Sequence, residues 1–263
     1  MTEPPGLWVY AVTEQAPEPE RLAGIGGLPV HAVADDGLAA VVSDVRLDEF
    51  GESSLHASLE DLAWLEATAK AHHQVIDSLA GIGPVVPMRL ATVFTSEGSL
   101  RTMLAERRGE LHQVLRRIGS GREWGVKGFA ATDRAAEPAT DSEPDVAGAA
   151  GSGAAYLQRR RGQLEASKRA RHDAARSAAD IHAALSELAA DSRLHPPQVP
   201  QLAGTTAPML LNAAYLLDGA GEQPFRAAVH HLARQHPAIR LQLTGPWPPY
   251  SFASLETTQE GRP

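Results

Sequence analysis

Three prolines and three aromatic residues crowd the stretch Leu243-Thr244-Gly245-Pro246-Trp247-Pro248-Pro249-Tyr250-Ser251-Phe252, which lies close to the end of this 263-residue chain. Proline fixes φ at about −65° and has no backbone N–H to donate. We therefore expect the stretch to leave the ladder of a sheet and to run as a stiff extended strap. Its aromatic side chains, Trp247, Tyr250 and Phe252, then need a cover, which is either the protein's own sheet or a partner.

The composition of the chain narrows its class. Hydrophobic residues make up 43% of it, enough for the cores of two domains, and it has no cysteine, which excludes disulfides and thiol chemistry. The net charge of −8 disfavours nucleic acid as a partner, because contacts from Lys and Arg supply most of the affinity for a phosphate backbone. No apolar stretch approaches the roughly 20 residues that span a bilayer, and the first residues do not resemble a signal peptide. These features predict a cytoplasmic protein with no membrane span.

Residues 1–120 are expected to form an N-terminal α+β domain. The tight-turn signal Asp35-Asp36-Gly37 separates two apolar, β-prone runs and predicts a hairpin. Ser58 followed by Asp61 approximates a capping box, after which apolar residues repeat at helical spacing until Gly81. The expected elements of this domain are strands at residues 7–12, 30–33, 38–45 and 85–94, and helices at 59–79 and 100–118.

Residues 121–263 are expected to form a C-terminal domain. Within it, residues 131–153 are rich in Ala, Gly and Pro and carry five acidic side chains against the single Arg134, so we expect a mobile acidic loop there. Beyond the loop the pattern alternates between helix and strand, which indicates an α+β sandwich of a modified ferredoxin-like kind with a long protruding helix. The expected elements are strands at 123–129, 209–217 and 239–243, and helices at 154–190 and 224–236.

The long helix changes character along its length. Its apolar residues form a sparse heptad-like seam, and six basic side chains crowd its first half. Such a helix is expected to pack on its own domain over one half and to project over the other. The projecting charges either contact a partner or form a solvated face with no specific role. The seam consists of Leu157, Leu164, Ala174, Ala178, Ile181, Leu185 and Leu188, and the basic residues are Arg159, Arg160, Arg161, Lys168, Arg169 and Arg171.

No local motif for catalysis or cofactor binding occurs in the sequence, which has no Gly-x-Ser-x-Gly, no phosphate loop and no Gly-x-Gly-x-x-Gly. The neighbouring His72 and His73 would point about 100° apart on a helix and would not chelate one metal ion. His72 falls on the apolar stripe, as a core histidine would. Arg89, the one charge in an apolar run, is expected to form a structural ion pair or to bind a ligand. We therefore name no catalytic, cofactor-binding or metal-binding residue.

Three runs follow one another along the chain: Gly83-Pro84-Val85-Val86-Pro87-Met88-Arg89-Leu90-Ala91-Thr92-Val93-Phe94, then Arg122-Glu123-Trp124-Gly125-Val126-Lys127, then the strap at residues 243–252. In this order they resemble the GvpF/GvpL family of gas vesicle proteins. The opening Trp8-Val9-Tyr10 is similar too, so the match spans nearly the whole chain. Leu90-Ala91 departs from the family pattern, in which Phe-Gly is expected.

The resemblance implies a non-enzymatic accessory protein of gas vesicle assembly, located on the gas vesicle or in the cytoplasm, with two α+β domains and no cofactor. Members of the family are thought to engage the small hydrophobic shell protein and other accessory proteins during vesicle nucleation or growth. A partner that shields the apolar surface of a shell subunit needs an apolar surface or a β-edge of its own. We therefore hypothesise that the shell protein docks on the strand at 239–243 or on the strap. The candidate partner-binding residues are Ile239, Leu241, Leu243, Trp247, Tyr250 and Phe252.

Two other functions stay open. A small-molecule-binding enzyme on a ferredoxin-like sheet would show a concave pocket with convergent polar groups, around Arg89 or Lys127. A regulator that senses a small molecule would associate through its sheet and long helix when the ligand binds, although the sequence has no helix-turn-helix pattern for reading DNA.

Overall fold

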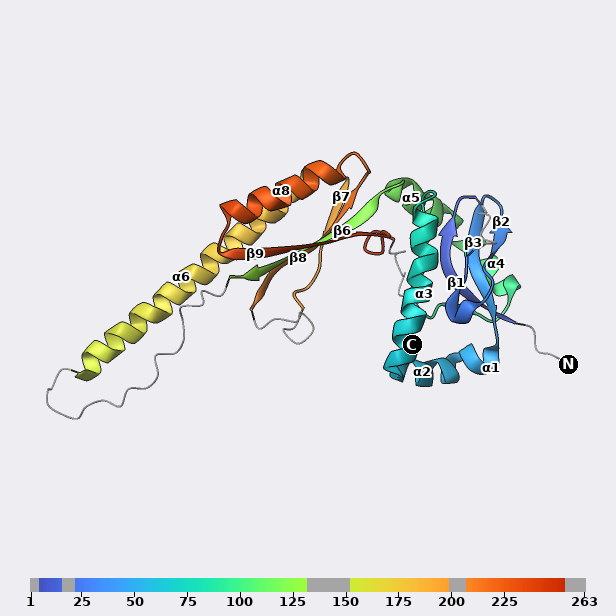
Figure 1. Cartoon of the computed structure of the whole chain (residues 1–263), viewed down its shortest axis with the longest axis horizontal. Coiled ribbons are helices and arrows are strands. Elements are labelled where there is room, and N and C mark those ends of the chain that lie inside the picture. Colours follow the sequence, from blue (N-terminus) through green and yellow to red (C-terminus); the bar gives the residue numbers. More distant parts are fainter. Residues whose placement is uncertain (1–4, 16–21, 132–151, 199–206, 254–263) are drawn as a thin grey trace. The chain divides into compact units, whose positions relative to one another are not determined.

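The computed structural model describes residues 5–15, 22–131, 152–198 and 207–253 (Figure 1). It is a mixed α/β structure with two antiparallel sheets. Contacts between residues divide the chain into two compact units: Met1–Trp124, Leu216–Gly219 and Gly245–Pro263 form the first, and Gly125–Tyr215 and Ala220–Thr244 form the second. The expected boundary at residues 120/121 lies close to the division at Trp124, but the segment from Gly245 groups with the first unit. Most of the expected acidic loop, residues 132–151, lies outside the described residues.

The sheet of the first unit is built around β1, in which every residue is buried. On one side β1 pairs antiparallel with β3, which pairs with β2 across the expected hairpin. At the turn of that hairpin Asp36 and Gly37 have φ values of 38° and 84°, the conformation that a two-residue turn of this kind requires. On its other side β1 pairs with two short strands. The strands are β1 (Gly6–Thr13), β2 (His31–Asp35), β3 (Leu38–Val45), β4 (Val86–Pro87) and β5 (Val93–Phe94).

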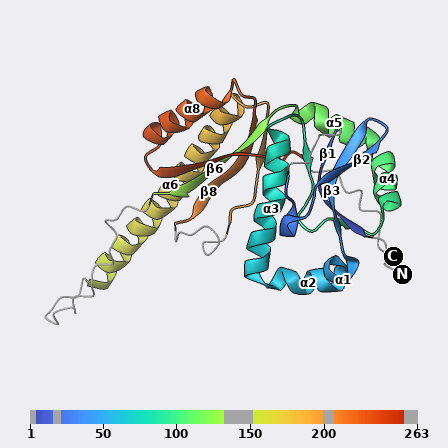
Figure 2. The same cartoon turned by 45° about the vertical axis from the view of Figure 1, so that its right-hand side comes forward.

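Helices cover both faces of this sheet, as a central strand buried on both faces requires. Figure 2 shows α3 on one side of the sheet and α4 and α5 on the other. Arg107 separates α4 from α5, where a single helix was expected at 100–118. The helices of the first unit are the 3₁₀ turn η1 (Ile25–Gly27), α1 (Leu47–Phe50), α2 (Glu52–Glu60), α3 (Leu62–Ala80), α4 (Glu97–Glu106) and α5 (Arg108–Ile118).

The long helix α3 begins later than its sequence predicts. Asp61 is its N-cap, and the carboxylate accepts hydrogen bonds from the backbone N–H groups of Ala63 (2.9 Å) and Trp64 (3.3 Å). Ser58 belongs instead to α2, where its hydroxyl donates to the carbonyl oxygen of Ser54 at 3.0 Å. The expected capping box was therefore wrong, because the first of its two residues lies inside a separate helix.

The prediction that His72 is a core histidine is confirmed. Its side chain is 3% exposed, and its Nδ1 accepts a hydrogen bond of 3.0 Å from the indole Nε1–H of Trp8. Since indole can only donate, the imidazole proton lies on Nε2, which donates to the carbonyl oxygen of Met88 at 3.1 Å. Burial lowers the pKa of His72 to about 4. The ring is therefore neutral at pH 7, and it joins α3 to β1 and to the segment after β4.

The expected extended run at residues 85–94 is two short strands with a turn between them. In the turn the backbone N–H and the hydroxyl of Thr92 donate to the carbonyl oxygen of Arg89 at 3.2 and 2.7 Å. Arg89 is exposed at this turn, so its charge is solvated and needs no buried carboxylate. The expected structural ion pair depended on a strand buried on one face, and this condition is not met because the chain leaves the sheet at this point.

The second sheet has the strand order β7-β8-β6-β9. Figure 1 shows α6 and α8 along one face of it. Tyr215 of β8 packs between the two helices, because its ring centroid lies 5.7 Å from that of His182 on α6 and 5.1 Å from that of Phe225 on α8. The elements are β6 (Arg122–Ala130), α6 (Ser152–Ser186), β7 (Asp191–Leu194), β8 (Met209–Leu217), α8 (Glu222–Gln235) and β9 (Ile239–Trp247).

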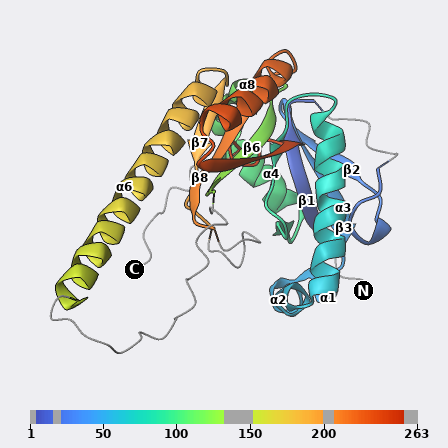
Figure 3. The ribbon, with the colours of Figure 1, turned by 60° about the vertical axis from the view of Figure 1, so that its left-hand side comes forward.

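Helix α6 packs over only one half of its length, as the sequence predicts. Ala178, Ile181 and Leu185 near its end are buried. All residues from 156 to 173 are exposed, and Figures 1 and 3 show this half of the helix running beyond the strands. No helix in the described part of the chain is long and apolar enough to cross a membrane.

The proline-rich strap follows a different course from the one expected. Strand β9 continues through Pro246 and ends at Trp247. It is an edge strand, and an edge tolerates proline because one side of the backbone has no ladder to complete. The chain then turns, and the N–H groups of Phe252 and Ala253 donate to the carbonyl oxygen of Pro249 at 3.1 and 3.0 Å. The strap is therefore half strand and half turn.

We predict that acid will weaken the first unit through His72. Its pKa falls from 6.5 to about 4 in the folded protein, so between these values the unfolded chain binds the proton and the folded chain does not. The stabilisation is complete above pH 6.5 and is lost as the pH falls toward 4. Between pH 7 and pH 5 the expected loss is about 2 kcal/mol of unfolding free energy.

Urea unfolding at the two pH values measures this loss. In a His72→Gln variant the amide can accept from Trp8 and donate to Met88 without titrating, and we expect a smaller pH dependence. An NMR titration of the intact protein that places the His72 pKa near 6.5 would contradict the prediction.

Candidate functional site

Residues 247–252, which we call the aromatic turn, are fixed by polar contacts with two other elements of the first unit. The carboxylate of Glu123 on β6 accepts hydrogen bonds from the backbone N–H and the hydroxyl of Ser251, both at 2.7 Å. The guanidinium group of Arg117 on α5 donates to the carbonyl oxygen of Phe252 at 2.6 Å. Hydrogen bonds to charged groups are stronger than neutral ones, so the turn has a defined position.

The outer side of the aromatic turn presents two large rings to solvent. Trp247 is 44% exposed and Tyr250 is 38% exposed. Both contact His73 on α3, whose ring centroid lies 5.6 Å from that of Trp247 and 6.2 Å from that of Tyr250, with the tyrosine ring stacked. These three rings, Trp247, Tyr250 and His73, form an aromatic platform.

The platform carries a neutral hydroxyl group at its edge. Burial, reinforced by the negative charges of Asp77 and Glu123, raises the pKa of Tyr250 to about 12. Asp77 lies one helical turn after His73 on α3 and pairs with Arg122 on β6. The phenol is therefore protonated at neutral pH and able to donate a hydrogen bond, so the surface suits a largely apolar partner with a few polar groups.

Gly245 allows the chain to enter the turn. It has a φ of +117°, a region that residues with a side chain rarely adopt. A Cβ atom at this position would lie 2.8 Å from the carbonyl oxygen of Glu123. The close approach of the two backbones therefore requires glycine.

The structure separates the six predicted partner-binding residues. Phe252 is fully buried and Ile239 is 2% exposed, so neither offers a surface to a partner in this form. Leu241 and Leu243 are half-buried on β9. Trp247 and Tyr250 remain as exposed apolar surface. The residues around them that the sequence did not indicate are His73, Asp77, Arg117 and Glu123, which come from distant parts of the chain.

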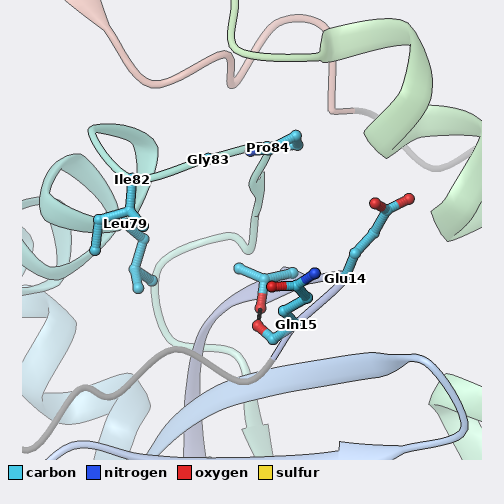
Figure 4. Close-up of a pocket in the computed structure, with 7 residues that line it drawn as sticks. Glu14, Gln15, Leu79, Ile82, Gly83 and Pro84 are labelled. Atoms are coloured by element: carbon cyan, nitrogen blue, oxygen red, sulfur yellow. Dashed lines mark hydrogen bonds between the residues drawn. The ribbon is translucent and has the colours of Figure 1, made fainter.

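A pocket of about 280 Å³ opens in the first unit, between the end of β1 and the end of α3. Figure 4 shows Leu79 and Ile82 on one wall and Glu14 and Gln15 on the other. Its volume falls just below the roughly 300–1,000 Å³ of small-molecule sites, and its described lining contains one ionisable group, Glu14. The polar side chains of Thr13 and Gln15 join Glu14 in this lining, and Leu79, Ile82 and Pro84 make the rest of it largely apolar.

The two residues around which the enzyme hypothesis expects a pocket, Arg89 and Lys127, are not among the described lining residues of this pocket. Lys127 belongs to the second unit and donates to the side-chain oxygen of Gln198 at 3.0 Å, whereas Arg89 belongs to the first unit. The described residues contain no cluster of three His, Cys, Asp or Glu side chains that could hold a metal ion. His72 and His73 point to different neighbours, Trp8 and the aromatic turn.

Comparisons with family models and with known proteins indicate the same family. The family described as "Gas vesicle synthesis protein GvpL/GvpF" matches residues 6–254. The chain belongs to the GvpL/GvpF family. Gas vesicle protein L of Streptomyces sp. (strain CB03234) is 37% identical to it over 266 residues, covering 97% of each chain. Gas vesicle protein F of the same strain is 27% identical, covering 93% of this chain and 98% of that protein.

A solved structure supports the same fold. The crystal structure of the gas vesicle protein GvpF from Anabaena sp. PCC7120 has a TM-score of 0.68 with 20% sequence identity, and the match covers 95% of this chain and 97% of that one. At this identity the likeness concerns the fold alone. This member of the GvpL/GvpF family is thus a mixed α/β structure, and the description of the family places it in the setting of gas vesicles.

We predict that replacing Glu123 by Ala will loosen the aromatic turn. The substitution removes two hydrogen bonds from Ser251 to a charged acceptor, and the expected loss of unfolding free energy is about 2–3 kcal/mol. Glu123→Gln, which keeps one acceptor oxygen, should lose less. Urea unfolding checks both values.

Glu106→Ala, at an exposed carboxylate on α4, is the matched control and should change the unfolding free energy by less than about 0.5 kcal/mol. Equal effects of Glu123→Ala and Glu106→Ala would show that the contact with Ser251 does not hold the turn.

Proposed function

We propose that this protein is an accessory protein of gas vesicle assembly that binds the small shell protein, other accessory proteins, or both, during nucleation or growth of the vesicle. The observation that carries the proposal is the family match over residues 6–254. We assign the protein no catalytic activity, no cofactor and no nucleic-acid partner. The small-molecule-binding enzyme or regulator stays the alternative function, and we take the pocket beside Glu14 as the candidate site for its ligand.

The aromatic turn is the surface to which we assign the shell protein. Trp247 and Tyr250 stay exposed although Phe252, two residues further, is buried. Exposed aromatic residues on a rigid support are typical of protein interfaces, because they bury a large area while losing little side-chain entropy. An apolar shell subunit could pack on the two rings, and the hydroxyl of Tyr250 could donate to a polar group beside them.

The edge of the second sheet is a second candidate surface for the same partner. Strand β9 is the last strand in the order β7-β8-β6-β9, so no described strand pairs with one side of its backbone, and an added strand can pair there. We further infer that the second half of the chain is a modified ferredoxin-like sandwich. The succession β6-α6-β7-β8-α8-β9 supports this inference, because ferredoxin-like units have the order β-α-β-β-α-β.

We also infer that the protein is an L-like member of its family. Its identity with gas vesicle protein L of one Streptomyces strain is 37%, against 27% with gas vesicle protein F of the same strain. A functional exchange separates the two assignments: in a host deleted for its L protein this chain should restore vesicles more fully than in a host deleted for its F protein.

Co-purification with the shell protein tests the assigned surface. We expect the tagged, intact chain to recover the shell protein when the two are expressed together, and a Trp247→Ala/Tyr250→Ala variant to recover at least about tenfold less, since aromatic residues at interface centres each contribute about 1–2 kcal/mol or more. Both side chains are more than one third exposed, so the variant should fold.

A matched control removes two exposed apolar side chains elsewhere in the first unit. Leu62 and Ile82 are each 79% exposed, and Leu62→Ala/Ile82→Ala should recover the shell protein as well as the intact chain does. If the aromatic double variant is folded by circular dichroism and still recovers the shell protein fully, the aromatic turn is not the binding surface.

A further inference from the structure

The exposed half of α6, residues 156–173, which we call the arm, has a charge opposite to that of the protein as a whole. It carries six basic residues and two acidic ones, a net charge of +4, on a chain with a net charge of −8. Every residue of the arm is exposed. At a rise of about 1.5 Å per residue the arm offers a surface about 27 Å long, or five helical turns.

Two leucines on the arm, Leu157 and Leu164, belong to the apolar seam of the helix. Leu157 and Leu164 precede Ala178 and Leu185 by 21 residues each, which is three heptads, so they occupy the same heptad position, with Arg171 at that position between the two pairs. In the packed half, Ala178 and Leu185 at this position are buried in the core of the second unit. On the arm, Leu157 and Leu164 are 62% and 49% exposed. The face that serves as core in one half of α6 is thus without a cover among the described residues in the other half.

The seam leads into an apolar hollow at the base of the arm. A cavity of about 650 Å³ lies between α6 and the ends of three strands of the second unit. Its walls include Ala170 and Ala174 of α6, Leu210 of β8 and Pro237 beside β9, and Arg171 supplies a cation at this site. A partner that follows the seam therefore meets more apolar surface where the arm joins the sheet.

Basic side chains flank the seam on the arm. Arg161 and Lys168 each lie four residues after a seam leucine, at the heptad position from which charges contact a neighbouring helix. Lys168 lies 3.9 Å from Glu165, an exposed pair that leaves most of the positive charge of the arm uncompensated. The surface is therefore amphipathic, with an apolar stripe bordered by positive charge.

We propose that the arm is a docking site for an acidic amphipathic helix of another protein, which covers Leu157 and Leu164 with its apolar face and pairs carboxylates with Arg161 and Lys168. A second copy of the same arm is a poor occupant, because two surfaces of charge +4 repel each other. A nucleic acid would use the cations but would leave the leucine seam without a cover. The site lies on the second unit and involves none of the residues of the aromatic turn.

Binding of designed helices to the full-length protein tests the proposal. The probe is a fluorescent peptide of about 20 residues with leucine at the two seam positions of each heptad and glutamate at the flanking positions, and its counterpart has lysine in place of glutamate. In anisotropy titrations we expect the intact protein to bind the acidic peptide, and an Arg161→Glu/Lys168→Glu variant to bind it roughly tenfold more weakly. The variant should in turn prefer the basic peptide.

Two further variants separate the contribution of the charges on the arm from that of its leucines. Arg116→Glu/Arg234→Glu makes the same change in net charge at exposed positions on α5 and α8, and should bind the acidic peptide like the intact chain. Leu157→Ala/Leu164→Ala removes the seam and should also weaken binding. If both charge variants lose the same affinity, or if the leucine variant loses none, the arm does not recognise an amphipathic helix.

Other occupants are distinguished in the same assay. A single-stranded oligonucleotide that displaces the acidic peptide from the arm at lower concentration would assign the arm to nucleic acid and overturn the proposal. Self-association in sedimentation velocity that Leu157→Ala/Leu164→Ala abolishes would assign it to a second copy. The Trp247→Ala/Tyr250→Ala variant should bind the peptide normally, so a failure of the shell-protein assignment would leave this result unchanged.

Discussion

The hydrogen bond between Trp8 and His72 sets the geometry of the first unit. β1 is buried along its whole length, and a polar group in such a place needs a partner, since an unpaired buried donor or acceptor is costly. The indole N–H of Trp8 donates a hydrogen bond to His72, and the hydroxyl of Tyr10 forms a hydrogen bond of 2.9 Å with the hydroxyl of Ser43. With both nitrogens of its ring engaged, His72 favours the rotation of α3 about its axis that also buries Val75, Ile76 and Leu79.

The position of the aromatic turn follows from that rotation. Successive residues on a helix point about 100° apart, so with His72 in the core, His73 is directed to the neighbouring side, where its ring contacts Trp247 and Tyr250. Asp77, four residues after His73, lies on the same side and pairs with Arg122. One face of α3 thus packs in the core, and the adjacent face contacts the candidate binding surface. The packing of the core therefore positions the exposed rings.

Much of the fold could be predicted from local patterns, and the failures have physical causes. The hairpin at Asp36-Gly37 and the packed half of α6 have short-range signals, and both are as expected. β7 was missed because its four residues, Asp-Ser-Arg-Leu, show no apolar alternation. β9 was predicted too short because Pro246 was expected to end the strand. At an edge strand the missing N–H can face the side without a neighbouring strand, so the strand continues.

The candidate site was harder to predict than the fold, because it is assembled from distant segments. Trp247 and Tyr250 were visible as aromatic residues, but the sequence does not distinguish them from the buried Phe252. That difference arises from Glu123 and Arg117, which lie 128 and 135 residues from their partners in the chain. The one available signal was Glu123 within the run Arg122-Glu123-Trp124, where a charge precedes a buried aromatic residue at the start of a strand.

The two proposed surfaces recognise a partner by different physical means. The aromatic turn is fixed before binding by hydrogen bonds from Ser251 to Glu123, so little conformational entropy remains to be lost there when a partner arrives, and affinity comes from apolar area. The arm carries long, exposed Arg and Lys side chains. The side-chain entropy that they lose on binding offsets part of the binding free energy of each ion pair. Their main effect is therefore on the rate of association and on the choice of partner. An accessory protein with both surfaces can select an acidic partner at the second unit while the first unit covers an apolar one. Salt should therefore weaken binding at the arm and leave binding at the aromatic turn largely unchanged, because screening acts on charges and not on buried apolar area.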